Sequence, residues 1–133
     1  MNGANIHIEG DNSEIVIGEN TTFYGKISIA ALENTKINIE KDCLFSSDII
    51  IRTGDSHKIY DEHRKRINKN KDINIKEHVW CGSNVIILKG SLISKNSIIG
   101  AGSVVTKKFQ QENICIAGNP AKMIKENVNW SYN

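Results

Sequence analysis

The sequence predicts an all-β fold, a parallel β-helix of stacked coils, on three observations. An aliphatic residue or a cysteine recurs at every sixth position from residue 75 to residue 105, the same period recurs in two shorter stretches upstream, and isoleucine dominates the composition. A six-residue period fits neither an α-helix at about 3.6 residues per turn nor an alternating strand at 2. It fits a solenoid in which each face of a coil is one short strand, stacked on the strand below at about 4.8 Å.

The longest repeat supplies the expected core of the solenoid. Each of the first five repeated residues is followed four positions later by a residue small enough for a tight corner, so the unit is an inward side chain, a short turn and the next inward side chain. The inward positions are Ile75, Cys81, Ile87, Ile93, Ile99 and Val105, and the expected corner positions are Val79, Val85, Ser91, Ser97 and Ser103.

The upstream repeats extend this pattern towards the N-terminus, with inward positions Ile17, Phe23 and Ile29, then Ile39, Phe45 and Ile51. Three faces per coil, about 18 residues, leave room for about five coils in one domain spanning residues 1–133. The chain has 23 Ile against 3 Phe, 2 Trp and 1 Pro. Stacked β-branched side chains suit the narrow interior of such a prism.

Charge and hydropathy exclude several classes of function. The formal net charge of +2 is too small to indicate binding to nucleic acid or to a membrane surface. No apolar run approaches the roughly 20 residues of a spanning helix, and no secretory signal is recognisable, so we expect a cytoplasmic protein. The three cysteines, Cys43, Cys81 and Cys115, form no CxxC pair and are predicted to be free thiols.

The repeat is interrupted from residue 52 to residue 72 by the polar segment RTGDSHKIYDEHRKRINKNKD. A long insertion inside a compact domain tends to be functional, and this one predicts a loop extruded from the solenoid. His57 lies between Asp55 and Asp61 at short spacing, an arrangement that can orient and activate an imidazole. The alternative for the KRINKNK run is a solvated stretch of charge.

The segment VWCGSNVIILKGSLISKNSIIGAGSVVTKKF, followed by AGNPAKMIK, resembles the C-terminal half of the left-handed β-helix hexapeptide-repeat acyltransferases. This family includes galactoside and maltose acetyltransferases and polysaccharide O-acetyltransferases, and GDSHKIYD stands where it carries its active-site histidine. The resemblance implies a left-handed coil, although parallel crossovers are ordinarily right-handed. It also implies a homotrimer with active sites between subunits, acetyl-coenzyme A as donor, a carbohydrate acceptor and no metal.

Acetyl transfer to a hydroxyl needs a base for the hydroxyl proton and donors for the developing oxyanion. On the resemblance His57 is the expected base, with Asp55 or Asp61 holding its other ring nitrogen; the sequence does not separate the two carboxylates. His63 is the alternative base.

The resemblance also implies a donor site. Trp80 would lie beside the donor and acceptor, or pack at a trimer contact. Backbone at Gly82 and Ser83 would approach the thioester, and nearby positions would line the pantetheine arm while lysines bind the phosphates. These remaining positions are Ala101, Thr106, Lys107, Lys108, Lys122 and Lys125.

The function expected is O-acetylation of a sugar hydroxyl in a surface polysaccharide or its precursor. The alternatives are N-acetylation of an amino sugar nucleotide, a zinc carbonic anhydrase and a non-catalytic scaffold. Carbonic anhydrase needs three histidine ligands, and the four histidines here include no closely spaced pair on the repeat. Residues 120–133 are predicted to form a short helix after Pro120, which closes the open end of the solenoid, and a tail.

Overall fold

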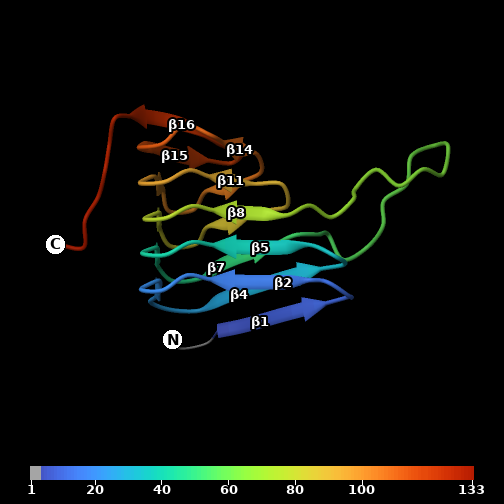
Figure 1. Cartoon of the computed structure of the whole chain (residues 1–133). Helices are drawn as coiled ribbons and strands as arrows, with labels where there is room; N and C mark the ends of the chain where they lie inside the picture. The colour runs from blue at the N-terminus through green and yellow to red at the C-terminus, as the bar shows by residue number, and fades with distance from the viewer. Residues whose placement is uncertain (1–3) are drawn as a thin grey trace.

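The computed structural model describes residues 4–133, and within them it contains 16 strands and no helix. The strands form three sheets that face one another as the sides of a prism (Figure 1). Sheet A holds β1 (Ala4–Glu9), β4 (Ile27–Leu32), β7 (Ile49–Arg52), β10 (Ile86–Ile87) and β13 (Val104–Val105). Sheet B holds β2 (Glu14–Ile17), β5 (Lys36–Ile39), β8 (Ile73–Ile75), β11 (Leu92–Ile93) and β14 (Lys108–Phe109). Sheet C holds β3 (Thr22–Phe23), β6 (Leu44–Phe45), β9 (Trp80–Cys81), β12 (Ile98–Ile99), β15 (Ile114–Gly118) and β16 (Ala121–Glu126).

Successive strands pass from sheet A to B to C, so each coil contributes one strand to each side. Five such coils stack in parallel, which confirms the coil number predicted from the repeat. Of the single domain expected over residues 1–133, residues 1–3 lie outside the described part of the chain.

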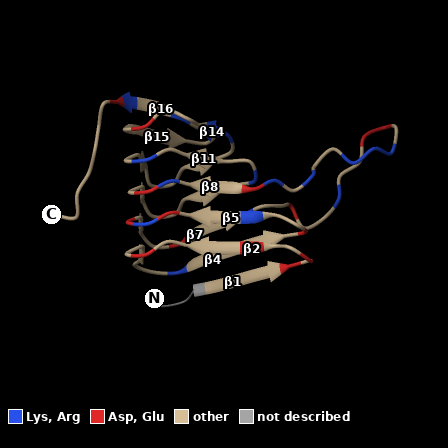
Figure 2. Ribbon diagram, viewed as in Figure 1, with Lys and Arg blue, Asp and Glu red and all other residues tan. Residues whose placement is uncertain are grey.

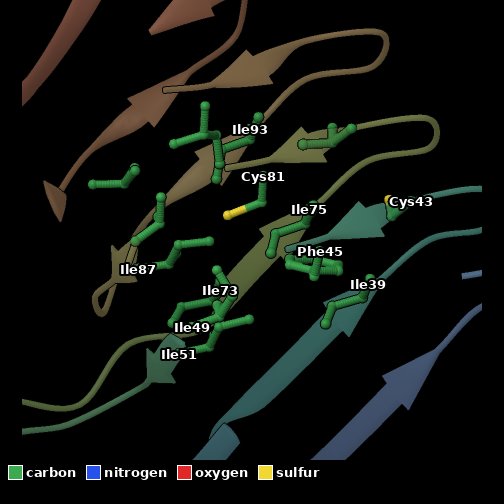
Figure 3. Close-up of a cluster of buried hydrophobic side chains, with 14 of the residues drawn as sticks. Ile39, Cys43, Phe45, Ile49, Ile51, Ile73, Ile75, Cys81, Ile87 and Ile93 are labelled. Atoms are coloured by element: carbon green, nitrogen blue, oxygen red, sulfur yellow. The ribbon is translucent and has the colours of Figure 1, made fainter. Parts of the chain in front are cut away.

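The six-residue repeat is the core (Figure 3). On sheet A, Ile29 stacks under Ile51 and Ile51 under Ile87, in parallel register. On sheet C the ring of Phe45 stacks on that of Phe23 at 5.0 Å, and Cys81 is its register partner in the coil above. The small thiol therefore follows the largest buried side chain, as close packing in a narrow interior requires.

The corners lie one residue earlier than the sequence pattern indicated. The expected corner residues, such as Val79 and Ser103, are buried inside the prism. The residue before each of them adopts the left-handed backbone conformation, with φ of 54° at His78, 59° at Asn84 and 74° at Gly102. Glycine and asparagine tolerate this conformation best, so they mark the corners.

The insertion leaves the prism between β7 and β8 and projects as a hairpin (Figures 1 and 2). Tyr60 and Arg66 form an antiparallel bridge within it. At its tip the carboxylate of Asp61 accepts hydrogen bonds from the backbone N–H of His63 at 2.8 Å and of Lys65 at 2.9 Å. The extruded loop is thus a hydrogen-bonded element whose basic residues lie along both arms.

The predicted C-terminal helix is wrong. Residues Ala121–Glu126 form β16, which pairs antiparallel with β15 at the end of sheet C. The last parallel strand would otherwise present unpaired backbone groups, and the returning chain satisfies them, so the open sheet edge overrides the local preference for a helix after proline. Only Ala121 of β16 is buried, so this strand contributes mainly backbone pairing.

Candidate active site

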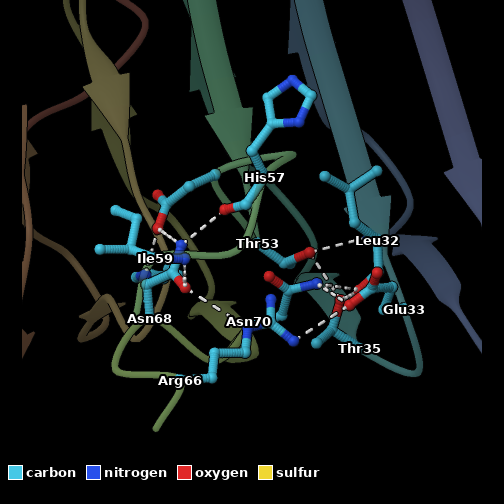
Figure 4. Close-up of polar contacts among 11 residues, drawn as sticks. Leu32, Glu33, Thr35, Thr53, His57, Ile59, Arg66, Asn68 and Asn70 are labelled. Atoms are coloured by element: carbon cyan, nitrogen blue, oxygen red, sulfur yellow. Dashed lines mark hydrogen bonds and ion pairs between the residues drawn. The ribbon is translucent and has the colours of Figure 1, made fainter. Parts of the chain in front are cut away.

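Two buried threonines fix the root of the hairpin to the coil below (Figure 4). The Oγ1 atoms of Thr35 and Thr53 are 2.6 Å apart, and Thr53 Oγ1 accepts the backbone N–H of Leu32 at 2.8 Å. Thr35 Oγ1 donates to the carbonyl of Leu32 at 2.6 Å. Because buried hydroxyls in full hydrogen-bonding networks have defined positions, the hairpin leaves the prism in a fixed direction.

Asn68 holds the backbone that carries His57. This asparagine is 6% exposed, and its Nδ2 donates to the His57 carbonyl at 2.8 Å and to Asp55 Oδ2 at 3.0 Å. Its Oδ1 accepts the backbone N–H of Ile59 at 2.8 Å. One side chain therefore ties together three residues on the opposite arm of the hairpin.

The His57 ring is exposed and points away from this network (Figure 4). No hydrogen bond from the described residues reaches either ring nitrogen. Asp55 instead pairs with Lys89 from the corner between β10 and β11, and this ammonium group, with help from Asn68, lowers the pKa of the Asp55 carboxyl. Since Asp61 bonds the hairpin tip, neither candidate carboxylate hydrogen-bonds the imidazole within this chain.

A polar cleft of about 300 Å³ opens on the outer face of sheet A beside the root of the hairpin. Arg52 lies in its wall, where its guanidinium donates to the carbonyl of Gly54 at 3.4 Å and to the hydroxyl of Ser56. Small side chains on β4 leave the space open. The cleft is lined by Asn5, His7, Glu9, Ser28, Ala30, Leu32, Arg52 and Ser56.

Several of the predicted donor-site residues lie together on sheet C and on the corner that leads from it to sheet A. Trp80 stands on the outer face of β9, and Gly82 and Ala101 come close on successive coils. A Cβ at Gly82 would lie 2.8 Å from the Ala101 nitrogen, so only glycine permits this approach. Lys122 pairs with Ala117 at the top of the same sheet. Ser83 and Lys125 belong to the same side of the prism.

The other predicted donor residues lie around another corner. Thr106 and Lys107 are exposed between β13 and β14, and Lys108 is on β14 in sheet B. That corner stands two coils above the root of the hairpin. The structure therefore splits the predicted donor set between two edges of one chain, and the hairpin that carries His57 projects on the side opposite the C-terminal tail (Figure 1).

His63 lies at the exposed tip of the hairpin, with its ring 3.5 Å from the carboxylate of Glu62. Among residues 4–133, no three His, Cys, Asp or Glu side chains are placed to hold a metal ion. The same part of the chain has no helix long and apolar enough to cross a membrane.

The sequence did not reveal Asn68, Lys89 or Arg52 as parts of the site. Asn68 was hidden in a run of basic residues, yet it is the one polar residue of that run with a buried side chain. Lys89 and Asp55 are 34 residues apart, and nothing in the pattern connects them. Alternation of asparagine with lysine in INKNK was the only available signal for Asn68.

The chain is similar in sequence and in structure to several known proteins. It is 41% identical over 134 residues to a polysialic acid O-acetyltransferase of Escherichia coli O1:K1, an alignment that covers 96% of this chain and 43% of that protein. The crystal structure of the polySia-specific acetyltransferase NeuO matches with a TM-score of 0.74 and 29% identity, covering 99% of this chain and 80% of that one. A maltose O-acetyltransferase from Clostridium difficile 630 matches with a TM-score of 0.68 and 31% identity, covering 94% and 70%.

A fourth protein, a hexapeptide-repeat acetyltransferase of Vibrio cholerae solved with acetyl-coenzyme A, is 22% identical with a TM-score of 0.62 and shows the shared fold alone. No family model matches the chain.

The prism is a left-handed parallel β-helix, the fold of the acetyltransferases that it matches. The chain belongs to the hexapeptide-repeat acetyltransferase family. It spans about half the length of the sequence relatives it matches.

Proposed function

We propose that this protein transfers an acetyl group from acetyl-coenzyme A to a sugar hydroxyl of a polysaccharide or its precursor, with His57 as general base. The observation that carries the proposal is the placement of His57. Its backbone is held by the buried Asn68 while its ring is exposed, with neither nitrogen hydrogen-bonded by any residue in 4–133, and a polar cleft opens at the same hairpin root. A general base must be held in a fixed position and must be accessible to its substrate. The bonded backbone and the exposed ring of His57 meet these two requirements.

In the proposed reaction a neutral His57 takes the proton of the acceptor hydroxyl as the hydroxyl oxygen attacks the thioester carbonyl. The resulting imidazolium then protonates the departing coenzyme A thiolate. The carbon–sulfur bond breaks as the new ester bond forms, so His57 returns to the neutral state. An acceptor oxygen entering the cleft beside Ser56 would meet polar side chains that can orient a sugar, including Arg52 and His7.

The donor would lie along the outer side of sheet C, from Gly82 and Ala101 up to Lys122. The close approach of the backbone at Gly82 and Ala101 favours placing the thioester end of the donor there. The exposed lysines of β16 suit the phosphates of coenzyme A as point charges. Acetyl-coenzyme A is proposed as this donor because the polysialic acid, galactoside and maltose enzymes in the family are O-acetyltransferases.

A homotrimer is part of the same proposal. His57 and the proposed donor position beside Gly82 lie on different edges of one prism. A complete site would therefore combine the hairpin of one subunit with sheet C of its neighbour. Such an assembly would also bring a partner to the free His57 ring. We further propose that the acceptor is a carbohydrate, since the relatives are named for a polysaccharide and a simple glycoside, and that the transfer takes place in the cytoplasm.

The test is release of free coenzyme A thiol from acetyl-coenzyme A on addition of a glycan panel containing oligosialic acid, maltose and a galactoside. Loss of a positioned base should lower the transfer rate of His57→Ala by about 10²–10⁴-fold. His63→Ala, a histidine of the same hairpin with an exposed ring, is the matched control and should keep full activity.

Removal of the product acetyl group by mild alkali would identify an ester. Absence of transfer to every glycan, or full activity in His57→Ala, would overturn the proposal. A product stable to alkali would indicate an amide and would overturn O-acetylation.

A further inference from the structure

The C-terminal tail, residues 127–133, does not cap the solenoid but descends along its side (Figure 1). Asn113 and Val128 exchange two hydrogen bonds, of 3.0 Å from the Val128 N–H and 3.1 Å from Asn113 Nδ2. Farther along, Trp130 Nε1 donates to the carbonyl of His78 at 2.9 Å. Asn113 and His78 lie two coils apart on the edge between sheets B and C. The aromatic residues of the tail therefore lie beside β9.

The tail builds an aromatic cluster on the outer face of sheet C. The Trp130 ring stacks on His78 with centroids 4.1 Å apart and planes inclined by 9°. Trp80 lies 6.1 Å from Trp130 and Tyr132 lies 5.3 Å from it, both tilted. Trp130 is therefore contacted by three aromatic rings, and Trp80 and Tyr132 keep part of their surface open to solvent.

These rings enclose what we call the tail cleft, a hollow of about 300 Å³ lined by Tyr24, Leu44, Ser46, Trp80, Trp130, Ser131 and Tyr132. Tyr24 is 67% exposed, Tyr132 is 51% exposed and Trp80 is 37% exposed. None of the lining residues carries a charge. Exposed aromatic faces gathered with hydroxyl groups around a concave surface are typical of a binding site and uncommon on an unused surface.

We propose that the tail cleft is a subsite for a sugar ring of the acceptor, next to the ring that is acetylated. A pyranose presents an apolar C–H face, which suits the electron-rich face of an indole or phenol, and a rim of hydroxyls, which suits serine and tyrosine side chains. The lack of a cation argues against a coenzyme A phosphate or a sugar carboxylate as the group bound here.

The position of the cleft supports this assignment, which rests on the proposed function. Trp80 belongs to the tail cleft, and Gly82, which follows β9 two residues later, lies beside the proposed thioester position. A glycan lying across Trp80 would therefore extend from the reacting hydroxyl into the cleft. The tail then acts as a specificity element, because Trp130 and Tyr132 hold sugar rather than take part in bond making.

The experiment measures acceptor KM, acetyl-coenzyme A KM and kcat for Tyr132→Ala, Tyr132→Phe and Trp130→Ala, with the most active glycan of the panel. Loss of one aromatic contact should raise the acceptor KM of Tyr132→Ala about five-fold. Trp130→Ala should raise the acceptor KM further. Tyr132→Phe should keep the acceptor KM close to that of the wild type, because the ring remains. The donor KM should stay within about two-fold throughout. Ile124→Ala, at a 63% exposed residue of β16 outside the cleft, is the matched control.

Quenching of tryptophan fluorescence by maltose or a galactoside, without donor, separates this proposal from the proposed function. An inactive wild-type enzyme whose fluorescence is still quenched, and less so in Tyr132→Ala, would refute the function but support the subsite. An active enzyme whose acceptor KM is unchanged in Tyr132→Ala and Trp130→Ala would refute the subsite alone. Dissociation of the oligomer in these variants would also refute it, since the cleft would then be a contact between copies of the chain.

Discussion

Asp55 and Lys89 form an ion pair that joins the hairpin to the coil above it. The pair links the two sides of the hairpin root, because Asp55 also accepts a hydrogen bond from Asn68 at 3.0 Å. The side chain of Asp55 is 40% exposed and that of Lys89 is 23% exposed, so water screens part of their attraction. The pair therefore positions the His57 segment more than it stabilises the fold.

This pair gives a pH-dependent prediction. The folded-state pKa of Asp55 is lowered from its ordinary value of 3.8, so the pair stabilises the fold above that value and loses this effect as the pH falls through the lowered pKa. Lys89→Met should therefore reduce the free energy of unfolding at pH 7 by at most about 1 kcal/mol. Urea unfolding of both proteins at pH 7 and in strong acid checks this. A stability difference that grows towards low pH would contradict the assignment.

The threonine pair at the hairpin root should matter more to stability. Thr53→Val keeps the shape of the side chain but removes the acceptor of the buried Leu32 N–H and the partner of Thr35. We expect a loss of about 1–3 kcal/mol, because a buried donor is left unsatisfied. Thr53→Ser retains the hydroxyl and is the matched control. Denaturant unfolding measures both, and equal stabilities of the two variants would show that the network contributes nothing.

Two glycine substitutions separate coil stacking from backbone strain. A Cβ at Gly18 would lie 2.4 Å from the Lys41 nitrogen in the next coil, so Gly18→Ala must push two coils apart. A Cβ at Gly102 meets nothing within 4 Å, and only its φ of +74° is unfavourable for alanine. Gly102→Ala should lower stability by about 1–2 kcal/mol, and Gly18→Ala should lower it more. Thermal unfolding ranks them, and the reverse order would refute the stacking argument.

Thiol reactivity tests the interior of the prism. Burial raises the pKa of Cys43 to about 11 and raises that of Cys81 further, whereas Cys115 is partly exposed. In the folded protein at pH 7 we expect an aromatic disulfide reagent to modify Cys115 and to spare the two buried thiols until denaturant is added. Fast reaction of two or three thiols without denaturant would contradict the packing of the core. The result also sets the background of the coenzyme A release assay.

The burial of Cys43 and Cys81 could be predicted from the sequence. Cys43 and Cys81 fall on repeat positions, and a small apolar side chain is what those positions hold. The same regularity identified Ile51, Ile87 and Val105 as inward-facing residues, and in the structure each meets its counterpart one coil away. The corner residues were placed one position late because a small buried side chain and a tight turn are adjacent in every repeat.

The active-site residues could be predicted only in part. His57 was found because it stands where the repeat fails and where the family carries a histidine. Its supports were not found, since Asn68 lies in a basic run. The expected orientation of the ring by Asp55 or Asp61 stays a prediction for the assembled protein, in which a neighbouring chain can complete the site.

By itself the sequence determined the number of coils, the residues of the core and the place of the hairpin, since a fixed period repeats the same contact from coil to coil. The tertiary structure decided the features that depend on contacts outside the six-residue repeat. It turned residues 121–126 into a strand because the edge of β15 needed a partner, and it joined Asp55 to Lys89 across 34 residues. It also brought Trp130 to His78 across 52 residues. Such pairs depend on where the folded chain passes, which no local pattern records.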